Sequence, residues 1–262
     1  PPRLWPAMIR EPLAGIASPI HALDPRARLA ACVGLSLVAA LAKQPATPLL
    51  IMGFGLMATL LSRPPWRYVL RQVLAVNVFI VFLWLVLPFT APGVEQRLPF
   101  ELPLGLTVSQ EGIHLAGLIT LKANAVFLCV LALLATIPVT ALGQAMTALG
   151  VPAKLAFLFI FTYRYLHVIA EEYARMMDVA ALRGFAPATD RRTYRTYGAL
   201  VAMVLVRGYD RSQRVYRAMV LRGFQGAFPS LHRFNFRTTD RLFLFLAMAV
   251  GVMAVTLGIR HG

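Results

Sequence analysis

Charged residues are scarce in this sequence, and acidic residues are the scarcest. Of its 262 residues, 14% are charged and 58% are hydrophobic, with only 11 Asp and Glu. Soluble domains average about 25% charged and about 45–50% apolar residues. Four runs lack charged residues altogether, and they contain 19, 23, 31 and 18 residues: 44–62, 72–94, 123–153 and 242–259. A helix needs about 20 apolar residues to cross a bilayer. The sequence therefore excludes a soluble globular enzyme and a disordered basic tail, and it predicts an all-α, polytopic membrane protein.

Residues that build catalytic and metal sites are also few. Cys32 and Cys129 are the only cysteines, and both lie in apolar runs, so they offer neither a disulfide framework nor a CxxC metal site. The sequence has no G-x-x-x-x-G-K-[ST] loop, which excludes ATP binding by that route. The histidines do not have the spacing of a metal site: His21, His114, His167, His232 and His261. We therefore predict that the chain is not an enzyme and builds no metal site.

Five apolar segments are candidates for transmembrane helices. We expect them at residues 27–43, 46–62, 70–90, 113–137 and 241–259. The first has only 14 uncharged residues at its centre, so it spans only if Arg28 and Lys43 extend to the two membrane surfaces. In the second, Gly53 and Gly55 allow another helix to approach closely. With five spans, the two ends of the chain lie on opposite sides of the membrane.

Arginine residues in the loops set the expected orientation, because short loops rich in Lys and Arg remain in the cytoplasm. Arg63, Arg67 and Arg71 lie in one loop without any acid, whereas the segment 91–112 contains one arginine and three glutamates. The arginine-rich loop should therefore face the cytoplasm, as should the N-terminus. The net charge of +15 then faces anionic lipid headgroups or a protein partner, and not nucleic acid.

The segment between the fourth and fifth spans is the most basic part of the chain. Residues 164–237 contain 13 Lys and Arg but only five acids. We accordingly divide the chain into a leader with four spans (1–137), a cytoplasmic helical region (138–240) and a last span (241–262). The apolar stretches inside the cytoplasmic region are too short to cross a bilayer alone.

Two long amphipathic helices are expected in this cytoplasmic region. Each begins with an apolar stretch, at 155–163 or 198–206, and continues with a charged face. In the first helix Glu171, Glu172 and Arg175 share the polar face, and Glu171 and Arg175 are four residues apart. In the second, arginines recur at steps of 4, 3 and 3 residues: Arg207, Arg211, Arg214 and Arg217. Such helices lie along a membrane surface.

The two helices end alike. RMMDVAALRGF (175–185) and RVYRAMVLRGF (214–224) share five of eleven positions. A Gly after the last turn adopts the left-handed conformation that ends many helices, and an Arg before it suits the negative end of the helix dipole. One interpretation is that both segments are capped helix ends whose arginines contact lipid phosphates. The other is that each helix end, with an exposed Phe, inserts into an apolar groove that has an acidic wall.

Three segments resemble a known family: YRYLHVIAEEYARMMDVAALRGF (163–185), AMVLRGF (218–224) and HALDPRARL (21–29). They resemble the transmembrane coupling subunit, or T component, of energy-coupling factor transporters, and within it the cobalt/nickel, CbiQ-like branch. In that family two cytoplasmic coupling helices each end in an Ala-Arg-Gly-type motif that docks on an ATPase subunit. The resemblance implies docking by the two matching ends, with Leu in place of the family's first Ala: Leu182, Arg183, Gly184, Phe185, Leu221, Arg222, Gly223 and Phe224. The residues that would support the coupling helices are Glu171, Glu172, Arg175, Arg211, Arg214 and Arg217.

The resemblance also implies a function. The chain would be a non-catalytic scaffold in the plasma membrane of a prokaryote, coupling two cytoplasmic ABC-type ATPase subunits to a separate substrate-binding membrane subunit that takes up cobalt or nickel. ATP and Mg²⁺ would be bound by the ATPase subunits, so this chain needs no cofactor. Three alternatives stay open: a T component for a vitamin, a self-contained permease or channel, and an enzyme acting on anionic lipid headgroups. Lys122, with Asn77 and Asn124, could line a polar path, and an intramembrane cation is by default a candidate functional residue.

Overall fold

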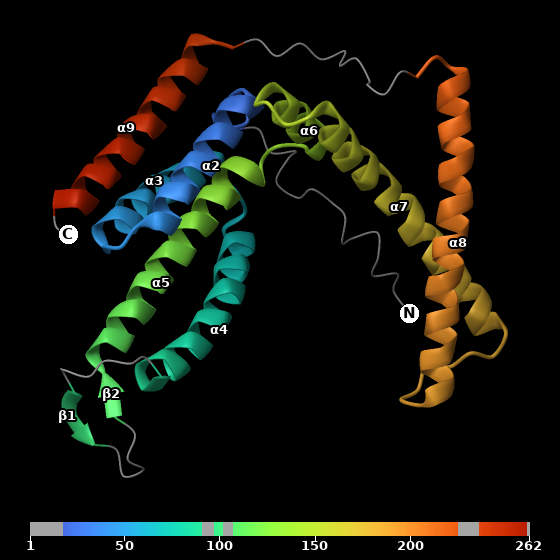
Figure 1. The fold of residues 1–262 in the computed structure, drawn as a ribbon, viewed down its shortest axis with the longest axis horizontal. Helices are drawn as coiled ribbons and strands as arrows, with labels where there is room; N and C mark the ends of the chain where they lie inside the picture. The colour runs from blue at the N-terminus through green and yellow to red at the C-terminus, as the bar shows by residue number, and fades with distance from the viewer. Residues whose placement is uncertain (1–17, 91–96, 102–106, 225–235, 261–262) are drawn as a thin grey trace. The chain divides into compact units, whose positions relative to one another are not determined.

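The computed structural model describes residues 18–90, 97–101, 107–224 and 236–260, and most of these residues are in α-helices (Figure 1). The chain divides into two compact units. Of the described residues, 139–224 form one unit, which we call the inserted unit, and 18–138 with 236–260 form the other, which we call the membrane unit. The predicted all-α fold is confirmed, with the addition of a short antiparallel pair of strands, β1 (Arg97–Glu101) and β2 (Thr107–Ser109).

The helices of the membrane unit lie at the five positions predicted for spans. They are α2 (Pro25–Leu41), α3 (Ala46–Ser62), α4 (Trp66–Thr90), α5 (Gln110–Cys129), which continues into the π-helical turn η1 (Val130–Leu134), and α9 (Thr238–Arg260). Local sequence explains several of the boundaries. The Asp24 carboxylate caps α2 by accepting a hydrogen bond from the Arg26 amide at 2.9 Å, and Pro25 occupies the first helical position. Arg63 ends α3 in the left-handed conformation, at φ 49°.

Small residues let the helices of the membrane unit approach closely, as is common in membrane proteins. A Cβ atom placed on Gly55 of α3 would lie 3.0 Å from Leu128 Cβ and 3.2 Å from the Cys129 amide nitrogen of α5. The role predicted for Gly55 is confirmed, whereas a Cβ atom placed on Gly53 would meet nothing within 4 Å. Alanines at the other contacts are fully buried: Ala39, Ala125 and Ala254.

Three of the five predicted spans are long and apolar enough to cross a membrane, and so is the helix Ala153–Leu182, whose apolar start alone was expected to be too short. By length and composition, four described helices could cross a membrane: Trp66–Leu87, Gln110–Leu134, Ala153–Leu182 and Thr238–Gly258. The helices α2 and α3 have 17 residues each, which corresponds to about 25 Å at 1.5 Å per residue. Both are therefore shorter than the hydrocarbon core of about 30 Å.

Arg28 also differs from its predicted position. Instead of extending to the membrane surface, its side chain is buried, and Nη1 donates a hydrogen bond of 3.1 Å to the Thr136 hydroxyl. The Thr136 hydroxyl holds the Arg28 guanidinium within the protein. The expectation that Arg28 and Lys43 extend to the two membrane surfaces is therefore wrong for Arg28. Arg28 instead joins α2 to the residues that follow η1.

The inserted unit consists of α6 (Val139–Ala148), α7 (Ala153–Leu182) and α8 (Arg191–Leu221). The two predicted amphipathic segments are confirmed as continuous helices of 30 and 31 residues. Gly143 of α6 packs against Ile160 of α7, with no room for a Cβ atom. The long helices α7 and α8 form a hairpin and cross each other (Figure 1).

Candidate docking site at two helix ends

The helix ends at 182–185 and 221–224, which we call the Arg-Gly ends, have the same backbone geometry. Gly184 and Gly223 are left-handed, with φ of 79° and 82°. The amide after each glycine donates to the carbonyl five residues earlier: Phe185 to Ala180 at 3.0 Å, and Phe224 to Met219 at 3.1 Å. These bonds define the Schellman motif, which satisfies carbonyls of the last turn. The predicted helix-ending role of both glycines is confirmed.

The residues before each glycine are exposed. Leu182 and Leu221 are each 88% exposed, and Arg183 and Arg222 are exposed as well. Among the large apolar side chains of the described residues, these two leucines have the highest exposure. Each end thus presents one apolar and one cationic side chain.

The two phenylalanines are not bare, contrary to expectation. Phe185 is half-buried, and its ring packs edge-on against Tyr197 of α8 with centroids 5.7 Å apart. Phe224 is half-buried, and its ring lies 5.7 Å from that of Phe157 in α7. Each phenylalanine therefore fastens one helix end to the neighbouring helix. Of the four matching residues at each end, the leucine, the arginine and the glycine are exposed and the phenylalanine is half-buried.

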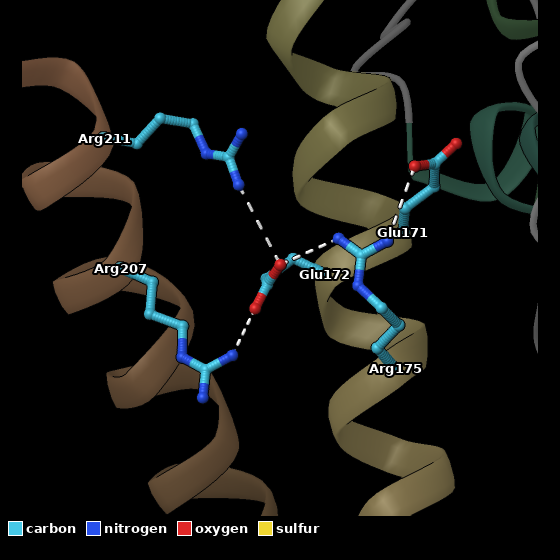
Figure 2. A network of polar contacts seen from close by, with 5 residues as sticks. All are labelled: Glu171, Glu172, Arg175, Arg207 and Arg211. Atoms are coloured by element: carbon cyan, nitrogen blue, oxygen red, sulfur yellow. Dashed lines mark hydrogen bonds and ion pairs between the residues drawn. The ribbon is translucent and has the colours of Figure 1, made fainter. Parts of the chain in front are cut away.

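Glu172 holds α7 and α8 together where they cross. Figure 2 shows its carboxylate between Arg175 of α7 and Arg207 and Arg211 of α8. It accepts from Arg175 at 2.8 Å, forms an ion pair with Arg207, and lies 4.0 Å from Arg211. Hydrogen bonds from Arg175 and Arg207 hold the pKa of the Glu172 carboxyl below its usual range.

The structure gathers only part of the predicted supporting set. Arg175 also contacts Glu171 at 3.6 Å, which confirms the predicted i,i+4 pair, but its closer contact is with Glu172. Arg211 joins the cluster, while Arg214 and Arg217 are exposed on the remainder of α8. The sequence assigns Arg207 only to a row of regularly spaced arginines, because the sequence of α8 does not show which residue of α7 this arginine faces.

The start of α8 is fixed by a capping interaction close to the first Arg-Gly end. The Asp190 carboxylate accepts a hydrogen bond from the Thr193 amide at 2.8 Å, and the Thr193 hydroxyl accepts from the Ala188 amide at 3.1 Å. Hydrogen bonds from Thr193 hold the pKa of the Asp190 carboxyl below its usual range. The short connection between α7 and α8 is therefore ordered by its own side chains.

Each docking arginine borders a groove between α7 and α8, but the two grooves differ. The groove at Arg183 measures about 680 Å³ and is lined by further charged residues, among them Arg192, Arg207 and Asp190. The groove at Arg222 measures about 860 Å³ and contains mostly aromatic and aliphatic side chains, among them Phe157, Phe161 and Tyr165. The ends are therefore alike in backbone and unlike in surroundings.

Lys122, the predicted intramembrane candidate, lies in the membrane unit and contacts backbone. Its ammonium group donates to the carbonyl of Ala40, in the last turn of α2, at 3.0 Å. Asn77 and Asn124 hydrogen-bond to each other between α4 and α5, at 3.1 and 3.3 Å. Within the described ranges, no three His, Cys, Asp or Glu side chains gather where they could hold a metal ion.

An apolar helical unit and a basic hairpin with two matched ends define a polytopic membrane protein. A family model described as "Cobalt transport protein" (CbiQ) matches residues 17–233. The chain belongs to this family. It is 28% identical over 189 residues to the cobalt transport protein CbiQ of Rhodobacter capsulatus. The aligned region covers 67% of this chain and 77% of that protein.

Two further relatives cover more of the chain. Both are energy-coupling factor transporter transmembrane proteins (EcfT). The one from Brevibacillus brevis is 22% identical over 91% of this chain and 92% of its own length. The one from Exiguobacterium sibiricum is 26% identical over 83% of this chain and 86% of its own length. The resemblance to the T component of energy-coupling factor transporters is thus confirmed, and the chain is a multi-pass membrane component of a transporter.

Proposed function

We propose that this chain is the non-catalytic membrane scaffold of an energy-coupling factor importer for cobalt or nickel ions. It couples ATP hydrolysis by two cytoplasmic ATPase subunits to uptake by a separate substrate-binding membrane subunit. The family match and the Rhodobacter capsulatus relative support cobalt as the substrate. ATP and Mg²⁺ bind to the ATPase subunits, and this chain holds no cofactor of its own.

One observation carries the proposal: two helix ends with the same Leu-Arg-Gly-Phe sequence and the same backbone geometry lie at opposite ends of one hairpin. Phe224 of the second end contacts Phe157 near the start of α7, whereas the first end follows α7 at Arg183. Those positions are 26 residues apart, which corresponds to about 39 Å of helix. Two ATPase subunits that close on ATP would bind one end each and change the separation or angle of α7 and α8.

The chemistry of each end fits an acidic, partly apolar groove on an ATPase. Arg forms hydrogen-bonded pairs with carboxylates, and the leucine beside it supplies apolar contact. Breaking a buried interfacial charge pair costs about 2–5 kcal/mol, which corresponds to at least about 30-fold in affinity. The basic loop with Arg63, Arg67 and Arg71 supports a cytoplasmic N-terminus. The protein would lie in the plasma (inner) membrane of a prokaryote.

The test is charge reversal at both ends. Arg183→Glu combined with Arg222→Glu should leave membrane insertion intact and abolish co-purification of the ATPase subunits. Arg214→Glu with Arg217→Glu is the matched control, because it changes the net charge equally on an exposed part of α8. Full ATP-dependent uptake by the end variant would refute docking. An equal loss of ATPase co-purification in the control variant would mean that the ATPase subunits are attracted to the basic surface of α8 in general and not to the two ends.

A further inference from the structure

A buried polar cluster lies in the membrane unit, whereas the proposed docking ends belong to the inserted unit. Its four side chains are between 1% and 6% exposed: Asp24, Arg28, Thr136 and Asp240. The Arg28 guanidinium donates to the Thr136 hydroxyl at 3.1 Å, and that hydroxyl donates to the Ala132 carbonyl at 2.9 Å. Arg28 also interacts electrostatically with the Asp24 and Asp240 carboxylates.

Asp240 joins two segments that are far apart in the sequence. One carboxylate oxygen accepts from the Asp24 amide at 2.8 Å, and the other accepts from the Arg237 amide at 2.7 Å. The first bond connects the start of α2 to the start of α9 across 216 residues. Together with the Arg28–Thr136 bond, the cluster joins α2, the end of η1 and α9.

The cluster adjoins the points where the membrane unit continues into the inserted unit. Thr136 is three residues before Val139, the first residue of α6. Asp240 lies in the first turn of α9, the helix that follows the second Arg-Gly end in the chain. Both segments are thus fastened to α2 by Arg28, Asp24 and Asp240 within the membrane unit itself.

The segment before Thr136 has the features of a deformable joint. In η1 the Ala135 amide donates to the carbonyl of Val130, five residues earlier, at 2.9 Å. Such π-helical turns are frequent at functional sites. Separating Arg28 from the Thr136 hydroxyl, or Asp240 from the Asp24 amide, leaves a buried charged group without a hydrogen-bond partner, so the cluster resists being pulled apart more strongly than apolar contacts would.

We propose that Asp24, Arg28, Thr136 and Asp240 are positioning residues that transmit movement of the coupling helices to the membrane helices. This inference rests on the proposed function. Movement of α7 and α8 reaches the membrane unit through the chain at α6 and α9, and the cluster passes it to α2. Weakening the cluster therefore uncouples ATP hydrolysis from uptake without weakening ATPase binding.

The test uses the whole transporter complex purified from native membranes and reconstituted into liposomes. Arg28→Met keeps side-chain length and removes the donor, and Thr136→Val removes only the hydroxyl, so it serves if Arg28→Met fails to fold. Arg241→Met is the control, because Arg241 is exposed beside Asp240. ATPase co-purification, ATP hydrolysis and metal uptake are measured for each, and the key quantity is metal taken up per ATP hydrolysed.

We expect uptake per ATP to fall at least tenfold in Arg28→Met and severalfold in Thr136→Val, with ATPase association and hydrolysis retained. The control should match the unaltered complex. Unchanged uptake per ATP in Thr136→Val, or uptake and hydrolysis that fall together in proportion to folded protein, would overturn the inference. If the unaltered chain binds no ATPase, the proposed function itself fails, which the same co-purification shows separately.

Discussion

Glu172 of α7 forms an ion pair with Arg207 of α8 where the two long helices cross (Figure 2). The same carboxylate accepts a hydrogen bond from Arg175 at 2.8 Å, so one acidic side chain serves arginines from both helices. The crossing lies between the two Arg-Gly ends along the hairpin. Its geometry therefore sets how a displacement at one end changes the position of the other.

Removing the Glu172 charge should loosen the crossing. In Glu172→Gln the neutral amide no longer compensates Arg175, Arg207 and Arg211, which then repel one another. We expect lower uptake per ATP with ATPase binding retained, measured in the reconstituted complex. Glu171→Gln is the control, because the Glu171 side chain is 72% exposed and lies 3.6 Å from Arg175. Equal effects of both variants would contradict a specific role for the crossing.

The start of α8 should lose stability at low pH through Asp190. Because the pKa of this carboxyl is lowered in the folded protein, its contribution is present above the ordinary aspartate pKa of about 3.9. It is lost as the pH falls through the lowered value. Hydrogen exchange of the first turn of α8 should therefore accelerate at acidic pH relative to its intrinsic rate.

Two variants distinguish titration of Asp190 from other acid effects. Asp190→Asn still caps the helix but does not titrate, so its protection factors should stay constant over the same pH range. Asp190→Ala should have low protection at every pH. A parallel loss of protection in the native protein and in Asp190→Asn would show that another group titrates.

Gly55 should tolerate no larger side chain. Gly55→Val places methyl groups against Leu128 and Cys129, and overpacking of this kind costs about 1–3 kcal/mol. Gly53→Val is a matched control on the same helix, where nothing lies within 4 Å. Thermal unfolding in detergent should show a lower midpoint for Gly55→Val alone. Equal midpoints for the two variants would be inconsistent with the close α3–α5 contact.

Lys122 should act by supporting α2 and not by conducting ions. Lys122→Met leaves the Ala40 carbonyl without its donor, at a cost of about 1 kcal/mol in stability. Lys122→Arg retains a donor and should be close to the native protein. We expect uptake per folded molecule to be unchanged in both. Loss of uptake by Lys122→Met at native stability would favour a polar path through the membrane.

Features of the helix ends that depend on local chemistry were predictable from the sequence. A glycine that ends a helix needs only its own conformational freedom, and Gly184 and Gly223 have the expected positive φ. The i,i+4 pair of Glu171 and Arg175 follows from helix periodicity in the same way. The positions of the five candidate spans follow from the length of the apolar runs.

Features that depend on another part of the chain were not predictable. The partners of Phe185 and Phe224 lie on the opposite helix, so the sequence indicated bare rings where the structure has packed ones. Arg28 looked like a cation at a membrane surface, because its acceptor Thr136 is 108 residues away. The only sequence signal for that cluster was the resemblance of HALDPRARL to the family's opening segment.

Photo-crosslinking from the exposed leucines tests the central claim most directly. A photoreactive amino acid at Leu182 or at Leu221 would be placed beside each docking arginine without changing the charge. In native membranes docking predicts a crosslink from each position to an ATPase subunit, whereas the same probe at Leu70 of α4 should yield none. Crosslinks from Leu182 and Leu221 to lipid alone, in a complex that still takes up metal, would contradict it.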